Sequence, residues 1–409
     1  MKNWKKEKLG DVCEFVRGPF GGSLKKNIFK EDGFAVYEQQ HAIYDQFNKI
    51  RYFIDEVKFN EMKRFELNSG DLIMSCSGTM GKIAIVPDKI KRGIINQALL
   101  KLSPSSKVST VFLKLWMQSE NFQESLEKHS KGAAIKNVAS VAILKKIEIP
   151  LPPLPEQQHI VVILDEVFGA IAKAKANAEQ NLKNVKELFE SYLQGVFETK
   201  GEGWEEKTLK EITTLLGDGL HGTPKYTEDG DYHFINGNNL KDGVIEFKTS
   251  TKRVSIEEYD KYKKNLTNRT VMVSINGTLG NVAFYNNEKI ILGKSACYFN
   301  MKDSVDKSYI KYVLSSPYFL LYAHKQATGA TIKNVSLKTM REFIVPLPSL
   351  KEQQTIVQKL DALSIETKRL EAIYQQKIND LEELKKSVLQ KAFAGELKED
   401  LKEHFAENA

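Results

Sequence analysis

The chain has 409 residues, of which 41% are hydrophobic and 28% are charged, and this balance predicts a globular protein of two or three domains. No apolar run has the length of a membrane span, the start MKNWKKEKLG has no apolar signal core, and the three cysteines lack paired spacing, which together favour a cytoplasmic protein without disulfides or zinc. The net charge of +7 lies mainly in two segments. Residues 1–150 hold 25 Lys and Arg against 17 Asp and Glu, and residues 201–345 hold 20 against 17. This positive surplus suits a surface that binds a polyanion, but it also suits an ordinary soluble protein.

The first 150 residues predict an α+β globule. Short runs rich in β-branched residues, Lys82–Val86 and Gly93–Leu102, are typical of strands. From Ser109 to His129 apolar residues recur at helical spacing after a serine start, which predicts a single helix. Its apolar stripe belongs to the core and not to a cofactor site.

A proline-rich knot ends this globule. Pro150, Pro152, Pro153 and Pro155 extend neither a strand nor a helix, so we expect them to hold the chain extended. Beyond the knot, apolar residues recur in steps of four and three from Ile160 to Val196, a seam that includes Tyr192. This is a heptad pattern with a stutter, and it predicts a helix of about 65 Å.

The second half repeats the first in order. WEEKTLKEI at Trp204 matches WKKEKLGDV at Trp4, SINGTLGNVAFY matches SCSGTMGKIAIV, TGATIKNV matches KGAAIKNV, and FIVPLPSLKEQQ matches IEIPLPPLPEQQ. Its strand-like run is Val271–Ile275, and its seam runs from Ile356 to Ala392 with Thr367 and Lys385 as polar interruptions. Lone helices of this length are unstable in water, so we expect the two to pack on each other. The predicted domains are globules at 1–150 and 200–346, long helices at 151–199 and 347–396, and an acidic tail at 397–409.

No motif for catalysis is found. Gly293-Lys294-Ser295 resembles the end of a phosphate loop, but Glu288 stands where its leading glycine belongs. No Asp/Asn-Pro-Pro-aromatic motif of an amino-methyltransferase occurs. We therefore predict no catalytic residue, no metal and no cofactor in this chain, while an enzyme without recognisable motifs stays an open alternative.

Three kinds of loop and one further element recur in both halves and carry donors suited to DNA. Glycine lets a backbone approach closely, lysine supplies charge for phosphate, and Asn and Gln can bind adenine bidentately, although amides also cap turns and the Gly-Thr-x-Gly motif also reads as a plain tight turn. The loop after the opening segment contributes Arg17, Ser23, Lys25 and Lys26, and His221, Thr223 and Lys225. The amide-rich loop contributes Gln39, Gln40 and His41, and Asn236, Asn238 and Asn239. The Gly-Thr-x-Gly turn contributes Thr79 and Lys82, and Thr278. The Ile-Lys-Asn-Val element contributes Lys136 and Lys333, and it suits a phosphate contact and a cap of the following segment equally well.

Two globules, each closed by a PLPxLxEQQxIV knot and a long helix, resemble the specificity subunit of type I restriction-modification enzymes. The resemblance covers Trp4 to about Glu396 and is most specific at Pro150–Val161 and Pro346–Val357. It implies two target-recognition domains, each reading one half of a bipartite sequence in double-stranded DNA, and an antiparallel coiled coil that spaces them. It also implies that the helices dock two methyltransferase subunits, which bring S-adenosylmethionine, and that restriction (motor) subunits join the full complex.

A tandem coiled-coil adaptor without DNA sequence preference is the alternative from another class. Salt-sensitive binding to short duplexes separates the two, because an adaptor has no reason to show it.

Overall fold

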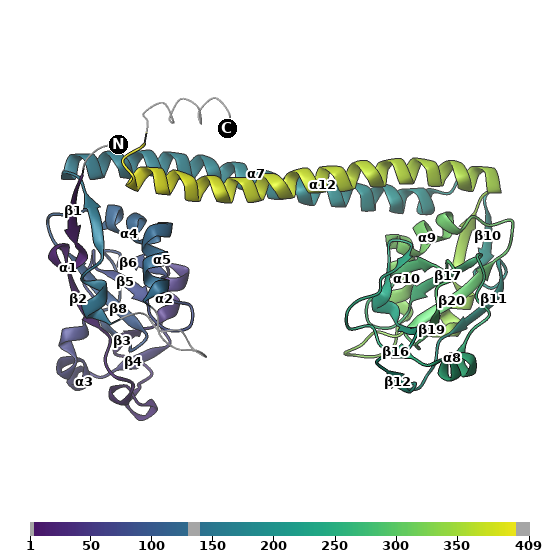
Figure 1. The fold of residues 1–409 in the computed structure, drawn as a ribbon, viewed down its shortest axis with the longest axis horizontal. Coiled ribbons are helices and arrows are strands. Elements are labelled where there is room, and N and C mark those ends of the chain that lie inside the picture. Colours follow the sequence, from purple (N-terminus) through teal and green to yellow (C-terminus); the bar gives the residue numbers. More distant parts are fainter. Residues whose placement is uncertain (1–3, 130–139, 398–409) are drawn as a thin grey trace. The chain divides into compact units, whose positions relative to one another are not determined.

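The computed structural model describes residues 4–129 and 140–397 (Figure 1). These fall into two compact units, unit 1 with Met1–Glu179 and Gln376–Ala409, and unit 2 with Gln180–Gln375. The unit boundaries lie inside two long helices, α7 (Leu154–Thr199) and α12 (Leu350–Phe393). Each unit therefore consists of one globule and part of both helices. In the described part of the chain no helix is long and apolar enough to cross a membrane.

The globule of unit 1 contains three sheets. They are the antiparallel pair β1 (Lys5–Lys8) and β9 (Glu148–Leu151), the antiparallel sheet β2 (Cys13–Arg17), β8 (Leu99–Pro104), β5 (Leu72–Ser75) and β6 (Ile83–Ile85), and the mixed sheet β4 (Tyr52–Ile54), β3 (Phe34–Tyr37) and β7 (Gly93–Ile95). In the mixed sheet β3 and β7 run parallel, so their carboxyl ends share one edge.

Short helices connect and cover these strands. They are α1 (Leu9–Val12), α2 (Gln39–Tyr44), α3 (Glu56–Glu61), α4 (Thr110–Gln118), α5 (Glu120–Lys128) and α6 (Val141–Leu144), with 3-10 turns η1 (Gly21–Ser23), η2 (Lys26–Ile28) and η3 (Lys63–Phe65). Phe112, Leu113 and Trp116 of α4 lie in one buried cluster with Leu72, Leu100 and Leu102 of the four-stranded sheet.

Unit 2 repeats the three sheets of unit 1 and adds one strand, β12, to the mixed sheet and a separate antiparallel pair, β14 with β15. Its sheets are β10 (Glu205–Thr208) with β21 (Ile344–Leu347); β11 (Thr213–Asp218), β20 (Ala296–Met301), β17 (Thr270–Ser274) and β18 (Val282–Phe284); β12 (Tyr226–Thr227), β16 (Arg253–Val254), β13 (Tyr232–Ile235) and β19 (Ile290–Leu292); and β14 (Leu240–Lys241) with β15 (Val244–Ile245). Its other helices are η4 (Gly237–Asn239), α8 (Ile256–Tyr262), α9 (Lys307–Ser315), α10 (Pro317–Gln326) and α11 (Leu337–Glu342). Again β13 runs parallel to β19. The shared topology supports the tandem duplication inferred from the sequence.

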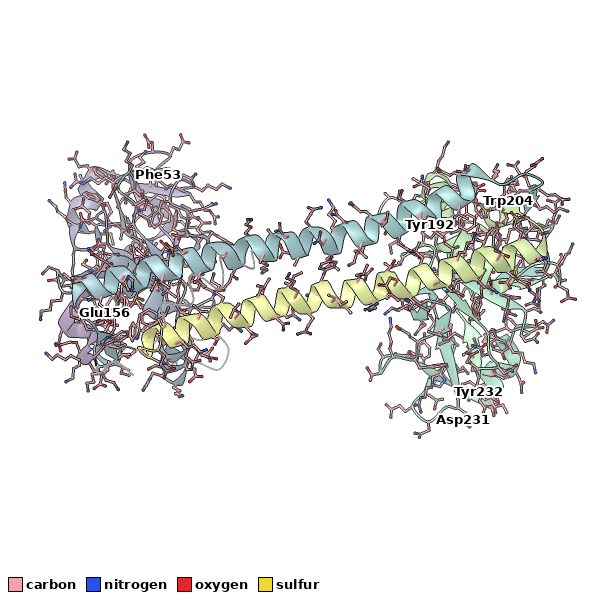
Figure 2. All side chains as sticks on the ribbon, turned by 90° about the horizontal axis from the view of Figure 1, so that it is seen from above. Phe53, Glu156, Tyr192, Trp204, Asp231 and Tyr232 are labelled. Atoms are coloured by element: carbon pink, nitrogen blue, oxygen red, sulfur yellow. The ribbon has the colours of Figure 1, made fainter. Side chains whose placement is uncertain are left out.

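The long helices pair antiparallel within each unit. In unit 1 the start of α7, with Ile160 and Leu164, shares a core with Val388 and Phe393 at the end of α12. In unit 2 the end of α7, with Phe197, shares a core with Val357 and Leu360 at the start of α12. Figure 2 shows Glu156 in the first turn of α7 and Trp204 just beyond its end. The α+β class with two long paired helices is confirmed.

Three predictions about the elements were wrong. The helix expected over Ser109–His129 breaks at Ser119, whose backbone is extended and whose Oγ donates to the Trp116 carbonyl at 2.6 Å. The strand expected over Gly93–Leu102 divides into β7 and β8, because a turn at Asn96 passes the chain from one sheet to the next.

The prediction for the knot was wrong for two of its four prolines, while Pro152 and Pro153 do lie between strand and helix. Pro150 belongs to β9, opposite Lys6, and Pro155 belongs to the first turn of α7. Both are positions that tolerate proline, since an edge strand and a first helical turn need no amide donor there.

The seam is correct in most positions, with one exception in each helix. Tyr192 is 45% exposed and Leu193 is buried instead, because the last turns of α7 pack on the globule of unit 2 as well as on α12. Lys385 is exposed, with its ammonium 4.9 Å from the ring centroid of Phe168. In unit 1 an ion pair also links the helices, with Lys175 Nζ 2.6 Å from Glu382 Oε1.

Candidate nucleic-acid interface

The candidate loops of unit 1 meet at the edge where β3 and β7 end. The amide-rich loop follows β3, and Asn96, which follows β7, donates its backbone N–H to the Tyr37 carbonyl at 2.8 Å. Gly18, at the end of β2, donates its N–H to the Leu99 carbonyl at 2.9 Å. A Cβ on Gly18 would lie 1.8 Å from the Asn96 carbonyl oxygen, so only glycine fits there. The first loop and the amide-rich loop are therefore neighbours.

The Gly-Thr-x-Gly turn lies at the same edge. It follows β5, and the Cys76 N–H donates to the Ala98 carbonyl at 2.9 Å. Gly78 and Gly81 have φ of 65° and 77°, values that favour glycine. Gly277 and Gly280 repeat this in unit 2, with φ of 76° and 81°. The tight-turn interpretation thus holds for the glycines, while Thr79 and Thr278 between them are exposed.

Unit 2 brings the corresponding loops together around a pocket. The Ser295 hydroxyl lies 3.0 Å from Asn236 Oδ1 and 2.8 Å from the Gly237 nitrogen, whose N–H it accepts. The Leu220 N–H donates to the Leu292 carbonyl at 2.6 Å. This hydrogen bond holds the loop that carries His221 beside Asn236 and Ser295. The pocket measures about 370 Å³ and is lined by Asn236, Asn238, Asn276, Gly277, Thr278 and Ser295.

The Ile-Lys-Asn-Val element of unit 2 packs against the Gly-Thr-x-Gly turn. The Gly277 N–H donates to the Lys333 carbonyl at 3.0 Å, and Asn276 Nδ2 donates to Asn334 Oδ1 at 3.0 Å. Asn334 thus supports the turn, while the Lys333 side chain is exposed. The corresponding Lys136 lies outside the described residues.

Two of the candidate base readers are buried and engaged inside their domains. His41 is 1% exposed; its Nδ1 accepts from the Glu38 N–H at 2.9 Å and its Nε2 lies 3.0 Å from the Lys49 carbonyl. Asn239 is 5% exposed; it accepts from the Asn236 N–H at 3.0 Å and donates to the Glu246 carbonyl at 3.0 Å. Both residues occupy the third position of the turn after the equivalent strand, so the capping interpretation applies to them.

Most of the other candidates face solvent. Exposed side chains are those of Ser23, Lys25, Lys26, Thr79, Lys82, His221, Thr223, Lys225, Asn238, Thr278 and Lys333, and half-buried ones are those of Arg17, Gln39, Gln40 and Asn236. Gln39 Oε1 is buried without a hydrogen-bond partner. His221 Nε2 lies 2.6 Å from Asp218 Oδ2, and Gln40 Nε2 donates to Glu38 Oε2 at 3.3 Å.

Cys76, the cysteine in this region, is buried, as are Cys13 and Cys297. Burial raises the pKa of the Cys76 thiol to about 12, against the opposing effect of the neighbouring Arg17 guanidinium. Burial likewise raises the pKa of Cys13 to about 12 and raises that of Cys297. These thiols stay protonated near neutral pH. Within residues 4–129 and 140–397 no group of three His, Cys, Asp or Glu side chains could hold a metal ion.

Sequence reasoning missed a basic segment of unit 2. Lys248, Lys252 and Arg253 are exposed, and Lys248 Nζ donates to the Asn238 carbonyl at 2.6 Å, next to the amide-rich loop. Residues 249–253 line a second pocket of about 660 Å³ together with Tyr226, Thr227 and Glu228. The run KTSTKR, with its hydroxyls between cations, was the available signal.

Comparison with known proteins gives the class. The family model for the type I restriction modification DNA specificity domain matches residues 1–183 and again 201–383. The chain belongs to this family, with two copies of its domain.

Particular relatives agree along the chain. The putative type I restriction enzyme MjaX specificity subunit of Methanocaldococcus jannaschii is 25% identical, over 97% of this chain and 94% of that protein. The EcoKI specificity subunit of Escherichia coli is 25% identical over 72% of this chain and 67% of its own. The HsdS subunit from Thermoanaerobacter tengcongensis has the same fold, with a TM-score of 0.60 at 19% identity over 96% of this chain and 97% of its own. A chain solved in a study of complex assembly in the type I R-M system has a TM-score of 0.76 at 20% identity, over 96% and 98% of the two chains. The two relatives found by sequence are specificity subunits, as predicted, and nothing in the comparisons supports the adaptor alternative.

Proposed function

We propose that each globule of this specificity subunit binds one half of a bipartite DNA target through the loops gathered at the carboxyl ends of β3 and β7, or of β13 and β19. The observation that carries this proposal is the meeting of loops from separate parts of the sequence at one edge in both units. Exposed basic side chains and amide side chains belong to these neighbouring loops, which supports a division between phosphate contacts and base contacts.

Within this surface we assign two roles. Basic side chains contact phosphates, because attraction between a cation and a phosphate does not depend on the base sequence. They are Arg17, Lys25 and Lys26 in unit 1, and Lys225, Lys248 and Lys333 in unit 2. Gln39, Gln40, Asn236 and Asn238 read base edges, because an amide can donate and accept at one adenine. His41 and Asn239 hold the loops that carry these readers.

We further propose that the complex forms in the cytoplasm and contains two methyltransferase subunits docked on α7 and α12, with restriction subunits joining them. Two copies of the specificity domain, and the packing of α7 on α12 in both units, support a ratio of two. S-adenosylmethionine would then be bound by the methyltransferase and not by this chain.

The test combines motif determination with binding. The motif is read from DNA methylated in cells that carry this chain and its methyltransferase, and the purified complex is then titrated with motif and scrambled duplexes at several salt concentrations. We expect tighter binding to the motif and a steep salt dependence for both. Lys25→Ala should weaken both equally and reduce the salt slope by about one, whereas Gln40→Ala should weaken only the motif. If the complex without any substitution bound the motif and scrambled duplexes with equal affinity, the proposal would be refuted.

A further inference from the structure

The loop between β2 and η1 carries an aromatic side chain in solvent. Phe20 is 92% exposed, the highest value among the large hydrophobic side chains of the described residues; the next, Val57, is 71% exposed. A single exposed apolar side chain is common on protein surfaces, so the meaning of this one depends on how its loop is built and what surrounds it.

Its backbone is nevertheless fixed on both sides. Before it, Gly18 is held against the Asn96 carbonyl and Pro19 is buried. After it, the Phe20 carbonyl accepts the Ser23 N–H at 2.8 Å, which closes η1. The backbone on both sides of Phe20 is therefore anchored, and this fixed backbone holds the ring in solvent.

Unit 2 presents a ring at the equivalent place. Gly219 packs against Leu292 as Gly18 packs against Asn96, with its would-be Cβ 2.3 Å from the Leu292 carbonyl. Two residues later, the side chain of His221 is 73% exposed and oriented by Asp218. Two diverged copies thus keep a planar ring two residues beyond the pinned glycine.

The neighbours of these rings identify the partner. Phe20 lies close in sequence to Arg17 at the end of β2 and to the exposed Lys25 and Lys26, and Lys225 follows His221 four residues later. Cations around an apolar ring suit a nucleic acid, whose phosphates pair with the cations while its bases offer stacking faces. An apolar protein surface would leave those cations without partners.

We propose that Phe20 in the first domain, and His221 in the second, insert their rings between or against the bases of their own half-site. This inference rests on the proposed function. The specificity of each domain then depends on the free energy needed to unstack a base step of its half-site, in addition to any base edges that its amides contact. Specificity would extend to base steps where no hydrogen bond is made.

The experiment uses the complex with the methyltransferase and duplexes carrying the motif determined from methylated DNA. 2-Aminopurine replaces one base at a time in each half, and its fluorescence is compared for the unmodified complex, Phe20→Ala, His221→Ala and the control Val57→Ala. We expect Phe20→Ala to abolish the fluorescence change at one step of the first half-site only, and His221→Ala to do so only in the second. Phe20→Ala should weaken binding about tenfold, equal to about 1.4 kcal/mol. A mismatched base pair placed at that step of the duplex should restore most of the affinity of the Phe20→Ala complex, because the bases there are already unstacked.

The outcomes separate the two proposals. If the unmodified complex prefers the motif but Phe20→Ala gives the same fluorescence and affinity, the ring inference is refuted and the proposed function stands. Loss of the methyltransferase from the Phe20→Ala complex would also refute it, since the ring would then be a protein contact. If the unmodified complex shows no preference for the motif, the proposed function itself fails.

Discussion

The side-chain carbonyl of Gln157, in the first turn of α7, accepts a hydrogen bond from the backbone N–H of Ser109 at 2.8 Å. Its amide nitrogen donates to the carbonyls of Lys107 at 3.0 Å and Pro152 at 2.8 Å. Gln353 does the same in unit 2, accepting from the Asp306 N–H at 2.8 Å and donating to the Pro348 carbonyl at 2.9 Å. Both glutamines are buried and join a long helix to the start of a globule helix. They fix the direction in which each helix leaves its globule.

This relationship predicts an unequal effect of two adjacent substitutions. Gln157→Leu leaves three backbone groups without their partner, the buried Pro152 carbonyl and the part-buried Ser109 N–H and Lys107 carbonyl. It should destabilise unit 1 by about 1–3 kcal/mol, since loss of the buried partner costs most. Gln158→Leu is the matched control, because Gln158 is exposed. Thermal unfolding of the full chain measures both. Equal midpoints for the two variants would show that the joint does not depend on Gln157.

The amide-rich loop of unit 2 offers a second matched pair. Asn239→Ala removes a buried turn support and should lower stability by about 1–3 kcal/mol. Asn238→Ala changes an exposed side chain, so we expect unchanged stability and a methylated motif relaxed at one position, by about 1–3 kcal/mol of discrimination. Unfolding midpoints and methylome sequencing separate the two. An unrelaxed motif in an active Asn238→Ala complex would remove this residue from the readers.

Because burial raises the pKa of the thiols, the free energy of unfolding should fall as the pH rises. Burial raises the folded pKa of Cys76 to about 12, so its stabilisation is complete below the unfolded pKa of about 8.5 and is lost as the pH rises toward 12. The native chain should react slowly with a thiol reagent at pH 8, and all three cysteines should react once it is unfolded. Between pH 8 and 10.5 the unmodified chain should lose about 2 kcal/mol more stability than Cys76→Ala. Rapid labelling of the native chain at pH 8 would contradict this.

The helices predict a change in target spacing. One heptad inserted after Ala178 and one at Tyr374 keep the seam and add about 10.5 Å, or roughly three base pairs at about 3.4 Å each. The half-site sequences should stay the same while the spacer in the methylated motif lengthens. The inserted turns also rotate the attachment of one globule, so weaker methylation is expected. An active variant with its original spacer would mean that the helices dock partners without measuring DNA.

Prediction from sequence succeeded where a periodic or repeated pattern was long. The seam from Ile160 to Val196 identified α7, and the repeated motifs identified two copies of one domain. It failed where a single residue decides between alternatives that look alike in sequence. Ser119 ends one helix and starts another, and Pro150 sits in an edge strand, because packing and strand pairing decide these positions.

The site was predicted in the same uneven way. The loops were identified because they recur, and the structure brings them to one edge in each unit. His41 and Asn239 were indistinguishable from their neighbours, since burial after a strand turn has no sequence mark of its own. The role of Gln157 and Gln353 was missed although Glu-Gln-Gln stands in both knots, because the hydrogen bonds join residues about 50 positions apart.

Each domain is expected to recognise one half of the target and to have no influence on the other half. The direct measurement replaces residues 1–150 with the corresponding domain of another specificity subunit of known target, and sequences the methylome of cells that also carry the methyltransferase. We predict that one half of the motif changes to that of the donor while the other half and the spacer stay the same. A motif changed in both halves, or in neither, would contradict the account.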